Sequence, residues 1–234
     1  MAIEDGFRLT LEHAAPSLGL ALTGEQIDAL LAYLQLIQKW NKVYNLTAVR
    51  DPADMLTHHL LDSLAVMAPL RGQLAKQGTQ TGPGAGPGAG APAVTRLLDV
   101  GSGAGLPGVV IAICCPELGV DCVDTVSKKA AFIQQVAATL RLPNLRGLHA
   151  RVENLTEKYD VISSRAFASL VDFTHLSVAA LAGQGVWMAM KGKHPADELV
   201  ALPAGVEVFH VEQLVVPGLD AERCIVWMRR RFGA

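Results

Sequence analysis

The sequence predicts an α/β fold with a mostly parallel sheet, preceded by a helical segment. After about residue 94, short apolar runs typical of strands alternate with helical runs, which favours parallel strands joined by crossover helices. The last two strand-like runs are adjacent in the chain and predict an antiparallel edge. Before about residue 67, apolar side chains recur at helical spacing instead.

The composition fits one sizeable α/β domain with an extension, or two small domains. The chain has 234 residues, 50% hydrophobic and 18% charged, with mean hydropathy +0.30, so a packed core is expected. The apolar run 106–115 is about half the length that a membrane span needs, and no signal-peptide pattern is visible. A net charge of -2 excludes a globally basic nucleic-acid binder and leaves a local basic patch open. The four cysteines show no zinc or disulfide spacing, which predicts buried, reduced thiols in a cytoplasmic protein.

The N-terminal helices carry start signals. Thr23 and Gln26 match a capping box, in which the hydroxyl and the amide each satisfy a free N–H group. Asp51 suits the cap of a second helix, and Pro52 suits its first position. Apolar stripes then occupy residues 27–40 and 55–67.

The chain divides into three predicted parts. Residues 1–77 form a helical extension. Residues 78–93, rich in Gly, Pro and Ala, form a flexible loop, because they have almost nothing to bury and much entropy to lose. Residues 94–234 form the α/β domain, and the extension packs with it as one unit.

The elements of the α/β domain follow in order after the loop. Ser127 suits the cap of the helix that follows the second strand. The predicted elements are strand 94–100, helix 106–115, strand 120–123, helix 128–140, strands 145–149 and 159–164, helix 170–181, strand 186–190, helix 195–201, and strands 206–216 and 223–230.

The first strand runs into a glycine-rich turn that opens a helix. Gly101, Gly103 and Gly105 alternate directly after the strand. In a doubly wound sheet this turn is where a nucleotide-like ligand binds, and glycine lets the ligand approach the backbone. A tight turn without a ligand is the alternative.

Two classes of ligand fit this turn. The spacing Gly103-x-Gly105-x-x-Gly108 also matches the dinucleotide fingerprint, a weak pattern on its own. Asp99 favours S-adenosylmethionine, because a carboxylate attracts the ammonium group of this cosubstrate and repels a pyrophosphate. Asp124, at the end of the second strand, suits ribose hydroxyls in either ligand.

Six short segments together carry a family resemblance. In order, they resemble segments of the bacterial small-subunit rRNA guanine-N7 methyltransferases (RsmG, also called glucose-inhibited division protein B), over most of residues 25–230. The segments are Asn41-Lys-Val-Tyr-Asn-Leu-Thr-Ala, His59-Leu-Leu-Asp-Ser-Leu, Asp99-Val-Gly-Ser-Gly-Ala-Gly-Leu-Pro-Gly, Arg151-Val-Glu, Ser164-Arg-Ala-Phe-Ala-Ser-Leu and Met190-Lys-Gly.

The resemblance implies a fold, an activity and a set of contacts. The fold is a class I, Rossmann-like methyltransferase with a seven-stranded, mostly parallel sheet, helices on both faces and an N-terminal helical extension. The activity is S-adenosylmethionine-dependent methylation of N7 of guanine 527 in 16S rRNA, with no metal. Cosubstrate contacts of the family match Gly101, Leu106, Val152, Glu153 and Arg165; the physical argument adds Gly103, Asp99 and Asp124.

The expected mechanism is in-line transfer without a general base, because guanine N7 has a lone pair and no proton. Arg165 and Lys191 are predicted to position the reactants. RNA contacts are predicted at Lys42, Lys191, Lys193 and Phe167; solvated lysines and a packed Phe167 are the alternatives. The expected partner is 16S rRNA or a small-subunit ribosomal particle, with no membrane and no obligate protein partner.

Three other functions remain open from the sequence. They are a small-molecule or protein methyltransferase on the same fold, an NAD-dependent oxidoreductase, and a binding module without catalysis. His58 and Asp62 share a helix face and raise a metal site as a further possibility, but no third ligand is evident, so a hydrogen bond is the preferred interpretation.

Overall fold

All the regular secondary structure described in residues 2–80 is helical. The computed structural model describes residues 2–80, 94–167 and 169–231. The predicted capping box at Thr23 and the predicted Asp51 cap are both confirmed by their hydrogen bonds. The helices are α1 (Ala2–Ser17), α2 (Gly24–Tyr44), α3 (Pro52–Met55), a π-helix (Leu56–Leu61), α4 (Asp62–Leu64) and α5 (Met67–Gln80).

A seven-stranded sheet forms the centre of the second part, in the order β3-β2-β1-β4-β5-β7-β6. Strands β1 to β5 pair in parallel, and β7 pairs antiparallel with both β5 and β6. The predicted α/β fold with an antiparallel edge is therefore confirmed. The strands are β1 (Arg96–Val100), β2 (Gly119–Asp124), β3 (Leu145–His149), β4 (Tyr159–Arg165), β5 (Leu181–Lys191), β6 (Val206–Leu214) and β7 (Arg223–Arg230).

Each face of the sheet has its own apolar core. Leu97 belongs to the larger core, which the N-terminal helices share, and its neighbour Leu98 belongs to the smaller one. This is the alternation expected of a strand covered on both faces. The connecting helices are α6 (Gly108–Cys114), α7 (Ser127–Thr139), α8 (Leu170–Ser177) and α9 (Ala196–Val200), with 3-10 turns at Val152–Asn154 and Val178–Ala180.

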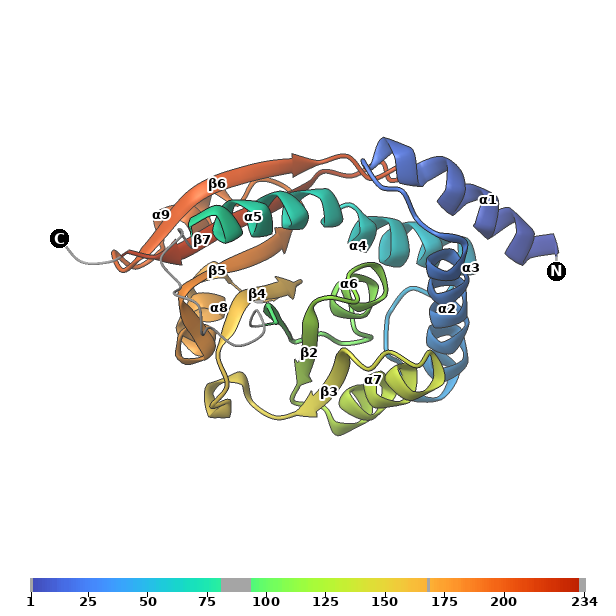
Figure 1. Cartoon of the computed structure of the whole chain (residues 1–234), viewed down its shortest axis with the longest axis horizontal. Helices are drawn as coiled ribbons and strands as arrows, with labels where there is room; N and C mark the ends of the chain where they lie inside the picture. Colours follow the sequence, from blue (N-terminus) through green and yellow to red (C-terminus); the bar gives the residue numbers. More distant parts are fainter. Residues whose placement is uncertain (1, 81–93, 168, 232–234) are drawn as a thin grey trace, which may run out of the picture.

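The arrangement of the layers is visible in Figure 1. Helices α2 and α6 lie on one side of the sheet with α7, and α8 lies near β4 and β5. Buried side chains of α2, α6 and α7 all enter the larger core, so the extension and the sheet bury a common apolar interior. None of the helices in the described ranges is long and apolar enough to cross a membrane.

Several predicted boundaries were wrong. Ser127 is the first residue of α7 rather than its cap. Val126 holds the cap position: its carbonyl accepts the N–H groups of Lys129 and Ala130, and its own N–H donates to the Asp124 carboxylate. The predicted helix 170–181 ends at Ser177, and β5 begins at Leu181 because this end of the strand pairs with the start of β4.

Two further predicted boundaries were wrong, and the prediction about the thiols is confirmed. Helix α6 begins at Gly108, two residues later than predicted. Helix α5 continues to Gln80, so residues 78–80 of the predicted flexible loop are helical, and residues 81–93 lie outside the described residues. All four cysteines are free and buried, as predicted.

Candidate active site

The glycine-rich turn joins the end of β1 to α6. Gly101, Gly103 and Gly105 all have positive φ, at 65°, 59° and 90°, a conformation that side chains with a Cβ rarely adopt. The Gly101 N–H donates to the carbonyl of Val123 at the end of β2, over 2.9 Å. The alternation of glycines in the sequence is therefore a requirement of this backbone path.

A cavity of about 420 Å³ opens beside this turn. It lies where the strand order reverses between β1 and β4, at the carboxyl ends of the strands, which is the usual ligand site of such sheets. A larger hollow of about 580 Å³ lies between α5 and the β6–β7 hairpin and shares none of its lining residues. The smaller cavity is lined by Val100, Gly101, Val123, Asp124, Thr125, Val126, Lys129, Ala150, Arg151, Val152, Glu153, Arg165, Ala166, Phe167 and Leu176.

Six predicted site residues meet in this cavity. Acidic, basic and apolar side chains line it together, a combination that suits a ligand with hydroxyl groups and an aromatic ring. The six are Gly101, Asp124, Val152, Glu153, Arg165 and Phe167.

Asp124 lines the cavity and binds the backbone on both sides of it. Its carboxylate accepts the N–H of Gly103 at 3.1 Å and that of Val126 at 2.9 Å. The ammonium group of Lys129 lies 3.6 Å from the same carboxylate. Gly103 thus contributes through its backbone contact with Asp124 and does not line the cavity. The sequence reasoning missed Lys129, although Lys128-Lys129 directly follows the predicted cap.

Asp99 lies behind the turn. It is fully buried, and its two carboxylate oxygens accept the N–H of Gly108 at 2.9 Å and the hydroxyl of Ser163 at 3.0 Å. Burial raises the pKa of Asp99 from 3.8 to about 6, although both hydrogen bonds oppose the shift. Asp99 does not line the cavity, and neither does Leu106, whose side chain packs in the larger core. Their direct contacts with a cosubstrate remain predictions.

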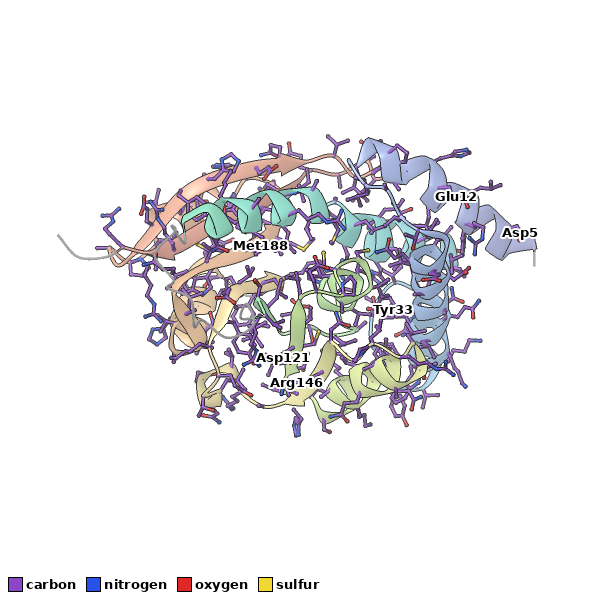
Figure 2. All side chains as sticks on the ribbon, in the orientation of Figure 1. Asp5, Glu12, Tyr33, Asp121, Arg146 and Met188 are labelled. Atoms are coloured by element: carbon purple, nitrogen blue, oxygen red, sulfur yellow. The ribbon has the colours of Figure 1, made fainter. Side chains whose placement is uncertain are left out.

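The helical extension contacts the glycine-rich turn through Tyr33. Tyr33 of α2 is fully buried, and its hydroxyl donates to the carbonyl of Ala104 over 2.6 Å. In Figure 2, Tyr33 lies between α2 and α6. Burial raises the pKa of Tyr33 well above 10, so this hydroxyl keeps its proton. Sequence reasoning missed this residue, because nothing near Tyr33 in the chain indicates a partner 71 residues away.

The end of β4 forms a second wall. Ala166 has φ +60°, which costs a residue with a Cβ about 1–2 kcal/mol. The ring of Phe167 packs against Phe173 at 5.7 Å between centroids, and its edge would lie 3.5 Å from a Cβ placed on Gly101. Backbone strain of this kind concentrates at functional sites.

The predicted RNA-binding lysines are not gathered in this cavity. Lys191 is only 14% exposed and its ammonium group lies 2.8 and 2.9 Å from the two carboxylate oxygens of Glu198. Lys193 is exposed in the segment after β5, and Lys42 is exposed in the last turn of α2. Lys191 thus lies where predicted, but its charge is neutralised by Glu198.

Comparison with known proteins identifies the family. A family model described as rRNA small subunit methyltransferase G matches residues 26–95 and 89–226. The chain is 64% identical over 228 residues to Ribosomal RNA small subunit methyltransferase G of Polaromonas naphthalenivorans, covering 97% of this chain and 98% of that protein. It is 71% identical over 213 residues to the protein of the same name from Albidiferax ferrireducens, covering 91% and 92%.

Solved structures agree on the fold. TrmN from Thermus thermophilus aligns with a TM-score of 0.52 at 20% identity, covering 75% of this chain and 53% of that one. A SAM-dependent methyltransferase from Aquifex aeolicus aligns with a TM-score of 0.50 at 15% identity, covering 79% and 96%. The chain thus shares its fold with these two structures, and it belongs to the rRNA small subunit methyltransferase G family.

Proposed function

We propose that the protein transfers the methyl group of S-adenosylmethionine to N7 of guanine 527 in 16S rRNA. The observation that carries the proposal is the match to the rRNA small subunit methyltransferase G family over most of the chain, together with a cavity at the end of the glycine-rich turn. The position of the methylated guanine comes from the resemblance of the sequence motifs.

The cavity fits the cosubstrate chemically. Asp124 and Glu153 supply carboxylate oxygens that can accept hydrogen bonds from ribose hydroxyls and from an adenine amino group. Val152 and Leu176 supply apolar surface for a purine ring. Gly101 keeps the wall free of side-chain atoms where a ligand approaches the end of β1.

The reaction requires the alignment of three atoms and no proton transfer. The sulfonium of the cosubstrate offers an electrophilic methyl carbon: a C–N bond forms with the N7 lone pair while the C–S bond breaks, and its electron pair stays on sulfur. Guanine N7 holds no proton, so no side chain is needed as a base. The protein's task is to hold N7, carbon and sulfur in line, an effect of proximity and orientation. We assign this task to Arg165 and Phe167, which line the cavity at the carboxyl end of β4.

The test is to map N7-methylguanine in rRNA from cells that lack this gene. We expect the modification at guanine 527 to be absent and to return with the wild-type gene, but not with a Gly101→Asp variant, because a carboxylate would enter the cavity. Purified enzyme offered naked 16S rRNA and unmethylated small subunits separates the two forms of substrate. Normal methylation at guanine 527 in the deleted strain would refute the proposal.

A further inference from the structure

A second cavity, of about 390 Å³, lies on the other side of the β4 end. It shares Arg165, Ala166 and Phe167 with the first cavity, so the two meet along this segment. Its size is within the range of about 300–1,000 Å³ that is typical of ligand sites. Its remaining walls come from the ends of β5 and β7 and from the N-terminal extension.

A buried carboxylate of the extension ties two arginines together at this cavity. Asp62, whose side chain is 3% exposed, accepts from Nη1 of Arg165 over 2.9 Å and from Nε of Arg223 over 2.8 Å. Nη1 of Arg165 also donates to the carbonyl of His58 over 2.8 Å. Asp62 directly follows the π-helix Leu56–Leu61, a distortion frequent at functional sites.

The two arginines retain capacity for a ligand. Their side chains are 23% and 22% exposed, both line the cavity, and each guanidinium has five N–H donors. One carboxylate neutralises only one of the two charges, so Arg165, Asp62 and Arg223 together keep one positive charge. The ammonium group of Lys191, in contrast, is matched by Glu198. The excess charge favours an anionic ligand with oxygen acceptors.

An aromatic surface adds to the site. Phe167 is partly exposed, lines the cavity and is braced by Phe173. Proteins bind an unstacked RNA base by combining an aromatic or guanidinium plane with donors to its polar edge. A base must leave its stack before an enzyme can reach one of its atoms.

We propose that this second cavity receives the guanine nucleotide that accepts the methyl group, and that Asp62 is a positioning residue that holds Arg165 and Arg223 toward the oxygen acceptors of that nucleotide. The inference rests on the proposed function. It assigns the donor to the first cavity and the acceptor to the second, with Phe167 between them. The residues that carry it are Asp62, Arg165, Phe167 and Arg223.

The first experiment uses a matched pair of variants of the full chain. Arg223→Gln removes the charge at the cavity, and Arg229→Gln removes a charge on the same strand that pairs with Glu207 instead. With unmethylated small subunits, we expect Arg223→Gln to raise KM at least about tenfold, as expected for losing a charged hydrogen bond, and Arg229→Gln to leave it unchanged. The dissociation constant for S-adenosylmethionine, measured by calorimetry, should stay within about twofold in both variants.

The second experiment tests the positioning role of Asp62. Asp62→Asn should raise KM in the same direction as Arg223→Gln, and Arg223→Lys, which keeps the charge, should recover part of the loss. If Asp62→Asn does not fold, the two Arg223 variants decide. Unchanged KM in both of them, or weaker cosubstrate binding with normal KM, would overturn the inference.

A binding assay separates this inference from the proposed function. Guanosine 5′-monophosphate and guanosine are titrated into the wild type and into Arg223→Gln, with S-adenosylhomocysteine present, and followed by NMR. We expect weaker binding of at least one of them to Arg223→Gln, and the comparison shows whether the phosphate or the base oxygen is bound. If nucleotide binding depends on Arg223 but the enzyme methylates no rRNA, the proposed function is refuted and the acceptor site is supported. Normal rRNA methylation together with nucleotide binding that does not depend on Arg223 would refute the acceptor site and leave the proposed function standing.

Discussion

Replacing Asp99 by asparagine should stabilise the protein above neutral pH. Asp99 is buried, and burial raises its pKa from 3.8 to about 6. Asparagine keeps an oxygen for the N–H of Gly108, and its amide can donate to Ser163, whose hydroxyl can turn toward the carbonyl of Leu98, 3.4 Å away. The substitution therefore removes a buried charge while keeping the packing and the hydrogen bonds.

The size of the effect follows from the pKa of Asp99. A pKa that is higher in the folded protein means that folding favours the protonated acid. The resulting stability is fully present below about pH 4 and is lost as the pH rises through about 6. The difference between 3.8 and about 6, at 1.36 kcal/mol for each pH unit, corresponds to about 3 kcal/mol as an upper figure. Asp99→Asn should recover up to this amount at pH 7.5 and little of it near pH 4.

Urea unfolding at pH 7.5 and pH 4.5 is the assay, with the exposed Asp220→Asn as a control. A variant that is less stable than wild type at pH 7.5, or a difference that does not change with pH, would refute the reasoning. We expect the affinity of Asp99→Asn for S-adenosylmethionine to fall in the same samples, because the negative charge that attracts the ammonium group is lost. A more stable protein with weaker binding is the trade-off common at functional sites.

Three further substitutions test the turn. Gly101→Asp should abolish binding of S-adenosylmethionine in calorimetry while the circular dichroism spectrum stays native; unchanged affinity would move the site elsewhere. Tyr33→Phe should lower the free energy of unfolding by about 1–3 kcal/mol, because the buried carbonyl of Ala104 loses its donor; a change in urea midpoint too small to detect would contradict this. Gly105→Ala should cost about 2–5 kcal/mol in the same assay, because φ is +90° and the new Cβ would lie 2.4 Å from Val109; wild-type stability would show that the turn can adapt.

The features that sequence predicted best are encoded by neighbouring residues. The capping box at Thr23 needs only a hydroxyl and an amide three positions apart, and the turn after β1 needs only alternating glycines. Ser127 shows the limit of such local signals. It is a good cap by type, but α7 begins one residue earlier than the pattern predicts, with Val126 at the cap position.

The features that could not be predicted are contacts between distant segments. Arg223 and Asp62 are 161 residues apart, and their pairing depends on how the extension packs against the end of the sheet. Lys191 was predicted at the correct edge, but its pairing with Glu198 depends on the turn into α9. A pattern places a side chain on an element, while its partner is determined by tertiary packing.

The position of β7 has a consequence for how the protein is made. This strand follows β6 in the chain, yet it lies inside the sheet between β5 and β6, and it carries Arg223. While a ribosome has yet to translate residues 223–230, the nascent chain exposes an unpaired edge of β5, and the Asp62 carboxylate lacks one of its two arginines. The arginine pair is therefore completed only after almost the whole described chain has been synthesised.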